Sequence, residues 1–131
     1  MSDFDLMDVT LVSEDFGRLD VPLRGDKREP VALPAGAVVA VVLSFRTDTE
    51  IDGLKFEETR SREGRRLTAL THMLGGFRAG GPYEVRLPAE RLPVGPASWG
   101  TYEATGRFLD GDGRELAQET HSFRIEPPPP N

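Results

Sequence analysis

The side chains that could do chemistry are few, and their spacing matches no common catalytic motif. The chain of 131 residues has two histidines, His72 and His121, and no cysteine. It contains no H-E-x-x-H metal motif, no G-x-S-x-G nucleophile elbow and no phosphate-binding loop with its lysine. The lack of cysteine excludes disulfides, thiolate nucleophiles and cysteine zinc sites. We therefore predict that the protein is not an enzyme and that it uses no cofactor and no metal.

A short acidic segment comes nearest to a metal-binding loop. Asp110-Gly111-Asp112-Gly113 carries two carboxylates, but it lacks the further oxygen ligands and the closing glutamate of an EF-hand loop. Alternating apolar residues flank it on both sides, and Asp-Gly is a strong hairpin-turn signal. We predict a β-hairpin turn here and no calcium site.

The remaining charged residues form no carboxylate pair. Glu57 and Glu58 are adjacent in a predicted strand, so their side chains point to opposite faces and cannot act together. Basic residues gather around one predicted hairpin tip: Arg60, Arg62, Arg65 and Arg66. This group is either a solvated hairpin end or a patch that binds an anion or a partner.

Composition excludes several classes of protein. The formal net charge is −6, which is opposite to the basic footprint of a nucleic-acid-binding protein. No apolar run approaches the roughly 20 residues that span a bilayer, and the acidic start lacks the features of a secretory signal. We predict one cytoplasmic domain that binds no nucleic acid and has no integral membrane segment.

Short alternating segments separated by glycine and proline predict an all-β protein. The predicted strands cover residues 7–13, 19–23, 31–33, 37–46, 54–62, 65–74, 83–87, 99–109 and 116–125. Pro22 indicates an edge strand, and residues 89–92 are predicted to form one helical turn. Many strands at close spacing favour an immunoglobulin-like antiparallel β-sandwich over residues 7–126. Residues 1–6 are predicted to be a short flexible N-terminus and residues 127–131 a proline-rich tail.

Six short pieces, taken in order, carry a family resemblance that runs from about Leu6 to Glu126. They are Ser44-Phe45-Arg46, Gly53-Leu54-Lys55-Phe56, Met73-Leu74-Gly75, Tyr83-Glu84, Gly100-Thr101-Tyr102 and Arg107-Phe108. Their order and spacing resemble the immunoglobulin-like domain of the Rho GDP-dissociation inhibitors. The resemblance implies a signalling protein that binds a small GTPase or another lipidated protein. It also implies that an isoprenyl or acyl group of that partner enters a cavity between two β-sheets.

The same resemblance implies the site residues. The lipid pocket is expected at Leu11, Val31, Val39, Phe45, Phe56, Ala104 and His121, and a partner contact is expected at Asp110 and Asp112. Four of the pocket residues differ from the family pattern, which has phenylalanine at Val31, tyrosine at Val39, isoleucine at Ala104 and tryptophan at His121. Two outcomes stay open. The sheets close up, because an empty cavity costs about 24 cal/mol per Å³, or they stay apart and leave room for a bulkier apolar ligand.

The family also has an N-terminal helical arm that grips the GTPase and blocks nucleotide release. Only about six residues precede the first predicted strand, so we expect this chain to lack the arm and the inhibition that depends on it. A composition rich in alanine, glycine, arginine and proline fits a GC-rich bacterial genome. Two hypotheses follow: a lipid-binding module, or a closed-core domain that binds a protein through its surface without lipid.

Overall fold

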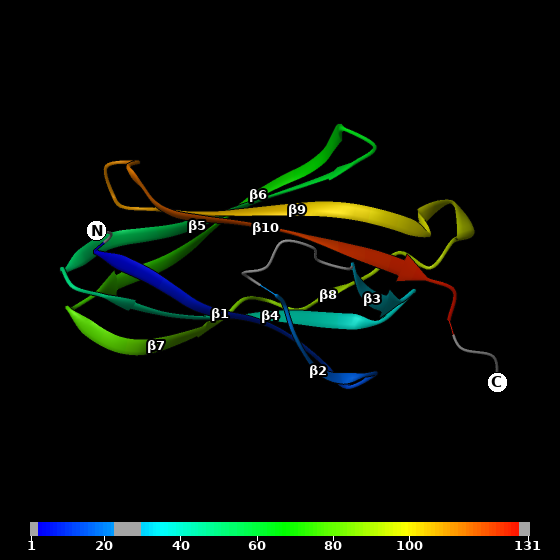
Figure 1. Ribbon diagram of the computed structural model, residues 1–131, viewed down its shortest axis with the longest axis horizontal. Coiled ribbons are helices and arrows are strands. Elements are labelled where there is room, and N and C mark those ends of the chain that lie inside the picture. Colours follow the sequence, from blue (N-terminus) through cyan, green and yellow to red (C-terminus); the bar gives the residue numbers. More distant parts are fainter. Residues whose placement is uncertain (1–2, 23–29, 129–131) are drawn as a thin grey trace.

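The computed structural model describes residues 3–22 and 30–128, which form two β-sheets packed face to face (Figure 1). The first sheet has the order β2-β1-β4-β7, with β8 also paired to β4. Its strands are β1 (Phe4–Ser13), β2 (Gly17–Asp20), β4 (Val38–Thr47), β7 (Gly80–Arg86) and β8 (Glu90–Arg91). The second sheet has the order β3-β10-β9-β5-β6. Its strands are β3 (Val31–Pro34), β5 (Ile51–Arg62), β6 (Arg65–Phe77), β9 (Gly100–Leu109) and β10 (Glu115–Glu126).

The predicted all-β sandwich is confirmed, with one difference in pairing. β3 runs parallel to β10, from Val31 beside Phe123 to Pro34 beside Glu126, so the second sheet is mixed and not wholly antiparallel. The two predicted hairpins are present. Arg62 pairs with Arg65 at one, and Leu109 pairs with Glu115 across the Asp-Gly turn at the other.

The first strand begins earlier than predicted. β1 starts at Phe4 and not at Met7, and the side chain of Phe4 is 3% exposed. Its ring lies 5.1 Å from the ring of Phe45 and 5.0 Å from that of Phe108. Residues 4–6 are therefore part of the sandwich and not of a flexible lead, while residues 1–2 lie outside the described part. At the other end β10 runs to Glu126, and residues 129–131 of the tail also lie outside it.

Two local predictions were wrong because sheet pairing decides the backbone there. Residues 89–92 form no helical turn. Glu90 and Arg91 pair with Val39 and Val38 of β4, and the amide of Leu92 donates to the carbonyl of Ala37 at 2.8 Å. The second strand ends at Asp20, and Leu23 lies outside the described residues. β2 is an edge strand, as Pro22 indicated.

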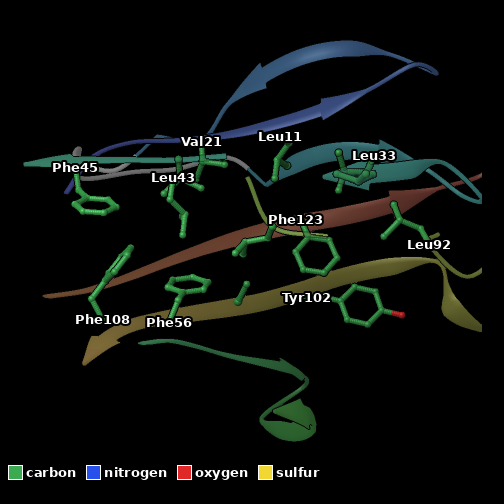
Figure 2. Close-up of a cluster of buried hydrophobic side chains, with 14 of the residues drawn as sticks. Leu11, Val21, Leu33, Leu43, Phe45, Phe56, Leu92, Tyr102, Phe108 and Phe123 are labelled. Carbon is green, nitrogen blue, oxygen red and sulfur yellow. The ribbon is translucent and has the colours of Figure 1, made fainter. Parts of the chain in front are cut away.

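Apolar side chains of both sheets fill the space between them (Figure 2). Phe45, Phe56 and Phe108 lie together toward one end of this core, and Leu11, Leu33, Leu92 and Phe123 lie toward the other. Phe45 and Phe108 are 0% exposed. The aromatic end is closely packed, with the rings of Phe56 and Phe108 4.9 Å apart.

Arg62 ties the hairpin of β5 and β6 to the segment before β9. Its guanidinium donates to the carbonyl oxygens of Ala97 (2.8 Å) and Trp99 (2.6 Å) and to the hydroxyl of Tyr102 (3.3 Å). It also lies 5.1 Å from the centre of the Tyr102 ring. This arginine therefore satisfies two backbone carbonyls that no strand pairing reaches.

We expect Arg62→Ala to lower the free energy of unfolding by about 1–2 kcal/mol, because two carbonyls lose a charged donor. Urea denaturation of the variant measures the loss. Arg65→Ala, an exposed site at the same hairpin tip, is the matched control and should change stability by less than about 0.5 kcal/mol. Equal losses in the two variants would contradict the assignment.

Candidate functional site

A pocket lies between the two sheets, and Phe56 separates it from Phe45 and Phe108 at the aromatic end of the core. Its cavity volume is about 40 Å³. The first sheet supplies apolar walls from Val9, Leu11, Val39 and Val41. The second sheet and the segment after β8 supply the apolar residues Leu33, Phe56, Leu92, Ala104 and Phe123. The polar lining residues are Glu58, Arg60, Glu119 and His121 from the second sheet and Glu90 from β8 of the first.

Most of the residues that the resemblance implied lie together here. The pocket is lined by Leu11, Val39, Phe56, Ala104 and His121, which come from β1, β4, β5, β9 and β10. Leu11, Val39, Phe56 and Ala104 are all buried, so an apolar surface faces the cavity from both sheets. Whether a lipid binds them stays a prediction.

Val31 and Phe45 are not among the lining residues. Val31 is half-buried at the start of β3, and Leu33, two residues further on the same face, reaches the cavity instead. Phe45 is fully buried in the aromatic cluster, 5.1 Å from the ring of Phe77 and 5.8 Å from that of Tyr83. Its place indicates a structural role in the core.

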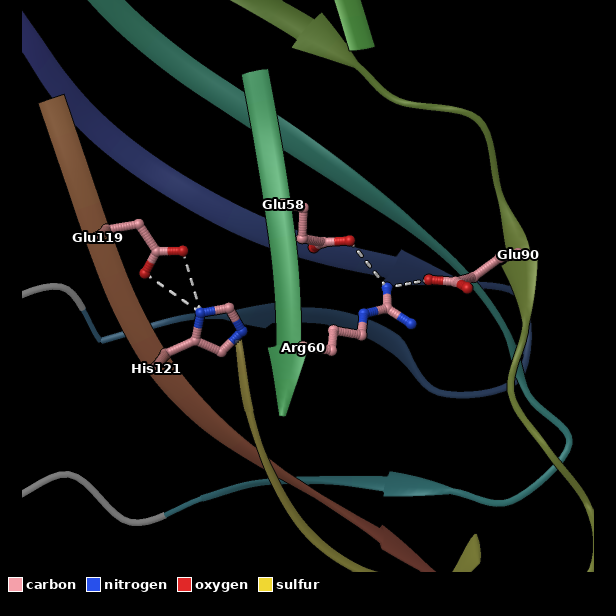
Figure 3. A network of polar contacts seen from close by, with 5 residues as sticks. All are labelled: Glu58, Arg60, Glu90, Glu119 and His121. Atoms are coloured by element: carbon pink, nitrogen blue, oxygen red, sulfur yellow. Dashed lines mark hydrogen bonds and ion pairs between the residues drawn. The ribbon is translucent and has the colours of Figure 1, made fainter. Parts of the chain in front are cut away.

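Four ionisable side chains from the inner face of the second sheet form one side of the pocket. We call Glu58, Arg60, Glu119 and His121 the polar wall (Figure 3). Strand register places them in two rows, since Arg60 pairs with Ala104 and Ala104 with His121, while Glu58 pairs with Gly106 and Gly106 with Glu119. The middle strand places only small residues, Ala104 and Gly106, between the charged ones.

Gly106 is required by this packing. A Cβ atom at this position would lie 2.6 Å from carbons of the Phe56 ring, which is far inside van der Waals contact. The absence of a side chain here lets Phe56 pack over β9 and brings the apolar core up to the polar wall.

Arg60 joins the two sheets at the pocket. Its guanidinium bonds to Glu58 on the same strand at 3.1 Å and to Glu90 on β8 of the first sheet. We call the Arg60–Glu90 pair the inter-sheet link. Burial lowers the pKa of Arg60, but the hydrogen bonds and charges of Glu90 and Glu58 outweigh it, so the pKa lies above its usual value. Arg60 is therefore a permanent cation held by two carboxylates.

His121 has a partner within the polar wall. Its Nδ1 atom lies 3.1 Å and 3.2 Å from the two carboxylate oxygens of Glu119. The two side chains are only 10% and 8% exposed, so this contact satisfies polar groups that would otherwise be costly to bury.

Of the four residues of the polar wall, only His121 was predicted from the sequence to line the pocket. Arg60 looked like part of a basic hairpin tip, whereas the structure directs Arg60 and Arg62 inward and leaves Arg65 and Arg66 exposed. Counting every second residue from Phe56 would have placed Glu58 and Arg60 on the core face. The partner Glu90 lies 30 residues away in sequence, and no local signal indicates it.

The expected contact residues Asp110 and Asp112 lie in the hairpin turn between β9 and β10. Oδ1 of Asp110 accepts hydrogen bonds from the amides of Asp112 and Arg114, both at 2.9 Å, so Asp110 stabilises its own turn. A surface hollow beside the turn is also lined by Glu50 and Asp52 at the start of β5. This end of the sandwich is acidic, and contact with a partner stays a prediction.

Two features are absent from the described residues, 3–22 and 30–128. No group of three or more histidine and acidic side chains is placed to hold a metal ion. No helix in the same part of the chain has the length and hydrophobicity to cross a membrane.

Comparison with known proteins agrees with the fold and gives the family. The crystal structure of the C-terminal domain of wzt superposes with a TM-score of 0.72, covering 96% of this chain and 75% of that chain. Its sequence identity is 11%, so this likeness shows the fold alone. A Rho GDP-dissociation inhibitor of Schizosaccharomyces pombe is 27% identical over 88 residues, which is 66% of this chain and 43% of that protein. The chain thus matches less than half of that relative's length.

The family comparison covers nearly the whole chain. The family described as RHO protein GDP dissociation inhibitor matches residues 2–127, which include every strand of both sheets. The match is therefore to the complete sandwich, including the pocket and its polar wall. On this evidence the chain belongs to the RHO protein GDP dissociation inhibitor family.

Proposed function

We propose that this chain is a non-enzymatic regulator that binds a small GTPase of the Rho type. We further propose that the pocket between the sheets receives an isoprenyl or acyl group of that partner. The observation that carries the proposal is the apolar pocket itself, which lies between the sheets of a family domain and is lined by Leu11, Val39, Phe56 and Ala104.

Binding of such a group requires the pocket to widen. The cavity volume is about 40 Å³. A dry engineered cavity of about 150 Å³ is known to admit benzene, and ligand pockets usually measure about 300–1,000 Å³. An isoprenyl chain therefore has to move the two sheets apart, or displace side chains that line them, before it can enter.

The inter-sheet link is the contact that such widening must break. Arg60 belongs to β5 of the second sheet and Glu90 to β8 of the first, so separation of the sheets at the pocket pulls these two side chains apart. Arg60 keeps Glu58 as a second carboxylate partner on its own strand. The guanidinium therefore stays paired when the link opens, which reduces the cost of opening.

A fluorescence titration with a dansylated geranylgeranyl-cysteine ester tests the lipid part of the proposal. Saturable binding, together with a higher melting temperature in the presence of the ester, would support it. A well-folded protein that shows neither effect would exclude the lipid function. The same titration with dansyl-cysteine methyl ester, which lacks the isoprenoid, controls for binding of the dye.

We expect Glu90→Gln to raise the affinity for the geranylgeranyl ester by about threefold to tenfold, because the neutral side chain weakens the link that resists opening. The titration above measures the change. Glu103→Gln, at an exposed position of β9, is the matched control and should leave the affinity unchanged. Weaker binding in Glu90→Gln alone would mean that the link holds the pocket in its binding form.

The small cavity volume favours a second candidate, a closed-core domain that binds a protein without lipid. Its surface would be the acidic end around Asp112, Glu50 and Asp52. Binding of an unprenylated Rho-type GTPase, weakened by Asp112→Lys, would support this candidate. Asp112 is the better choice for charge reversal because Asp110 stabilises the turn. Binding only of the geranylgeranylated form would exclude it.

A further inference from the structure

β6 is an edge strand of unusual length and exposure. It runs from Arg65 to Phe77 and pairs with β5 on one side. Among residues 3–22 and 30–128, no strand pairs with its other side, so a row of backbone donors and acceptors faces outward at the rim of the second sheet (Figure 1). Such an edge is a template for another strand.

This edge lacks two of the usual protections against pairing, charged residues and proline, and its β-bulges at Leu67 and Leu74 lie outside residues 68–73. From Leu67 to Phe77 the chain contains no Asp, Glu, Lys, Arg or Pro, although charged residues and proline are what commonly block an edge. Three large apolar side chains are exposed there instead, Leu67 by 49%, Leu70 by 50% and Met73 by 67%. The middle part, residues 68–73, pairs with residues 55–60 of β5 without a register shift, so it is regular enough to accept a further strand.

The charges along the β5–β6 hairpin favour a second copy of this chain, in antiparallel orientation, as the added strand. The tip carries exposed Arg65 and Arg66 and one exposed acidic residue, Glu63. The opposite end carries exposed Glu50 and Asp52 and one exposed basic residue, Arg78, so the tip is basic on balance and the other end acidic. The Asp52 carboxylate is 3.8 Å from the point where Gly76 would carry a Cβ atom, so it lies beside β6. A second copy that runs antiparallel brings the basic tip of each chain to the acidic end of the other, whereas a parallel copy brings like charges together.

We propose that two copies of this chain pair through β6 as an antiparallel dimer. A two-fold axis perpendicular to a sheet passes between directly opposite residues, so one residue lies opposite itself. With Leu70 at the axis, Leu67 lies opposite Met73 of the second copy, and all three exposed apolar side chains are paired. The β-bulges at Leu67 and Leu74 end the regular pairing on both sides of residues 68–73. Beyond them the antiparallel arrangement places the basic tip of each chain beside the acidic end of the other.

The dimer joins the two five-stranded second sheets into one continuous sheet. The proposal does not rest on the proposed function, because neither the lipid nor the GTPase takes part in it. The two proposals can therefore fail separately.

Sedimentation equilibrium of the purified chain from micromolar to millimolar concentration tests the dimer. We expect a concentration-dependent dimer, and we expect Leu70→Lys to weaken it by about tenfold or more, since two ammonium groups then face each other at the axis. Val94→Lys, at a site that is 59% exposed and remote from β6, is the control and should leave the dimer intact. A monomer at every concentration, or a dimer that Leu70→Lys does not weaken, would overturn the proposal.

A charge exchange tests the antiparallel register. Arg65→Asp and Asp52→Arg should each weaken the dimer, and the double variant should recover at least part of the loss, because the swapped charges meet across the axis. The two residues lie at opposite ends of one hairpin, so no contact within a single chain can produce this recovery. Additive losses in the double variant would overturn the register. Circular dichroism of each variant confirms that the monomer fold is unchanged.

Discussion

Phe45→Ala is expected to lower the free energy of unfolding by about 3–5 kcal/mol, the usual cost of deleting a buried phenylalanine ring. Phe45 is 0% exposed and lies within 5.1 Å, centroid to centroid, of both Phe4 and Phe77. It also contacts Tyr83 and Phe108, so the deletion leaves a void bordered by rings of both sheets that cannot all move inward. Urea denaturation and thermal unfolding should show the loss, with a fall in melting temperature of about 10 °C or more.

The size of this loss distinguishes two roles for Phe45. A residue that lines a ligand pocket has space on one side, and its truncation costs little in the unliganded protein. Phe45→Leu, which keeps most of the buried volume, should cost about half as much as Phe45→Ala or less. If Phe45→Ala lowers the free energy of unfolding by less than about 1 kcal/mol and also abolishes lipid binding, Phe45 is a pocket residue and not a core residue.

Strand positions could be predicted because period-two alternation is a local signal. The predicted strands 54–62 and 65–74 lie within β5 and β6, which extend three residues further at their ends away from the hairpin tip. Asp110-Gly111 identified the turn between β9 and β10. The start of β1 was missed because Asp3 and Asp5 made the segment look like a polar lead. In fact Phe4 alternates with these acidic residues, and its ring fills a place in the core that only the folded sandwich defines.

The apolar walls of the pocket could be predicted from the strand faces and the family resemblance, but the rest of the pocket could not. The side chains of Leu11, Val39, Phe56 and Ala104 lie on the inner faces of the two sheets. They therefore come together when the sheets pack face to face. The link from Arg60 to Glu90 could not be predicted, because β8 is two residues long and is held in place by its pairing with β4. Its position depends on tertiary contacts and on no periodic pattern.

The cavity volume was beyond sequence reasoning for a similar reason. Smaller residues at Val39 and Ala104 allow either collapse or an open space, and the choice depends on how far the two sheets can approach each other. The cavity between the sheets has a volume of about 40 Å³, so the sheets are close to the arrangement in which they have closed up. On the proposed lipid function, an apolar ligand would have to widen this space before it could bind.

Ala104→Trp is expected to abolish binding of the geranylgeranyl ester and to lower the free energy of unfolding by about 1–3 kcal/mol. Ala104 is 3% exposed on β9, between Arg60 and His121 in the strand register, and it lines the pocket. An indole ring is larger than the cavity of about 40 Å³, so it must displace neighbouring side chains and also occupy the space that the isoprenoid would need. Titration with the dansylated ester and urea denaturation measure the two effects.

The two effects together test where the lipid binds. Ala32→Trp, at an exposed position of β3, adds the same side chain outside the core and should change neither stability nor affinity. Loss of binding in Ala104→Trp alone would place the isoprenoid between the sheets. Retained binding, with the expected loss of stability, would place the ester on the outer surface and exclude the pocket as its site. A more stable variant would mean that the indole fills space the sheets had kept open, since filling a void stabilises a core and overfilling it does not.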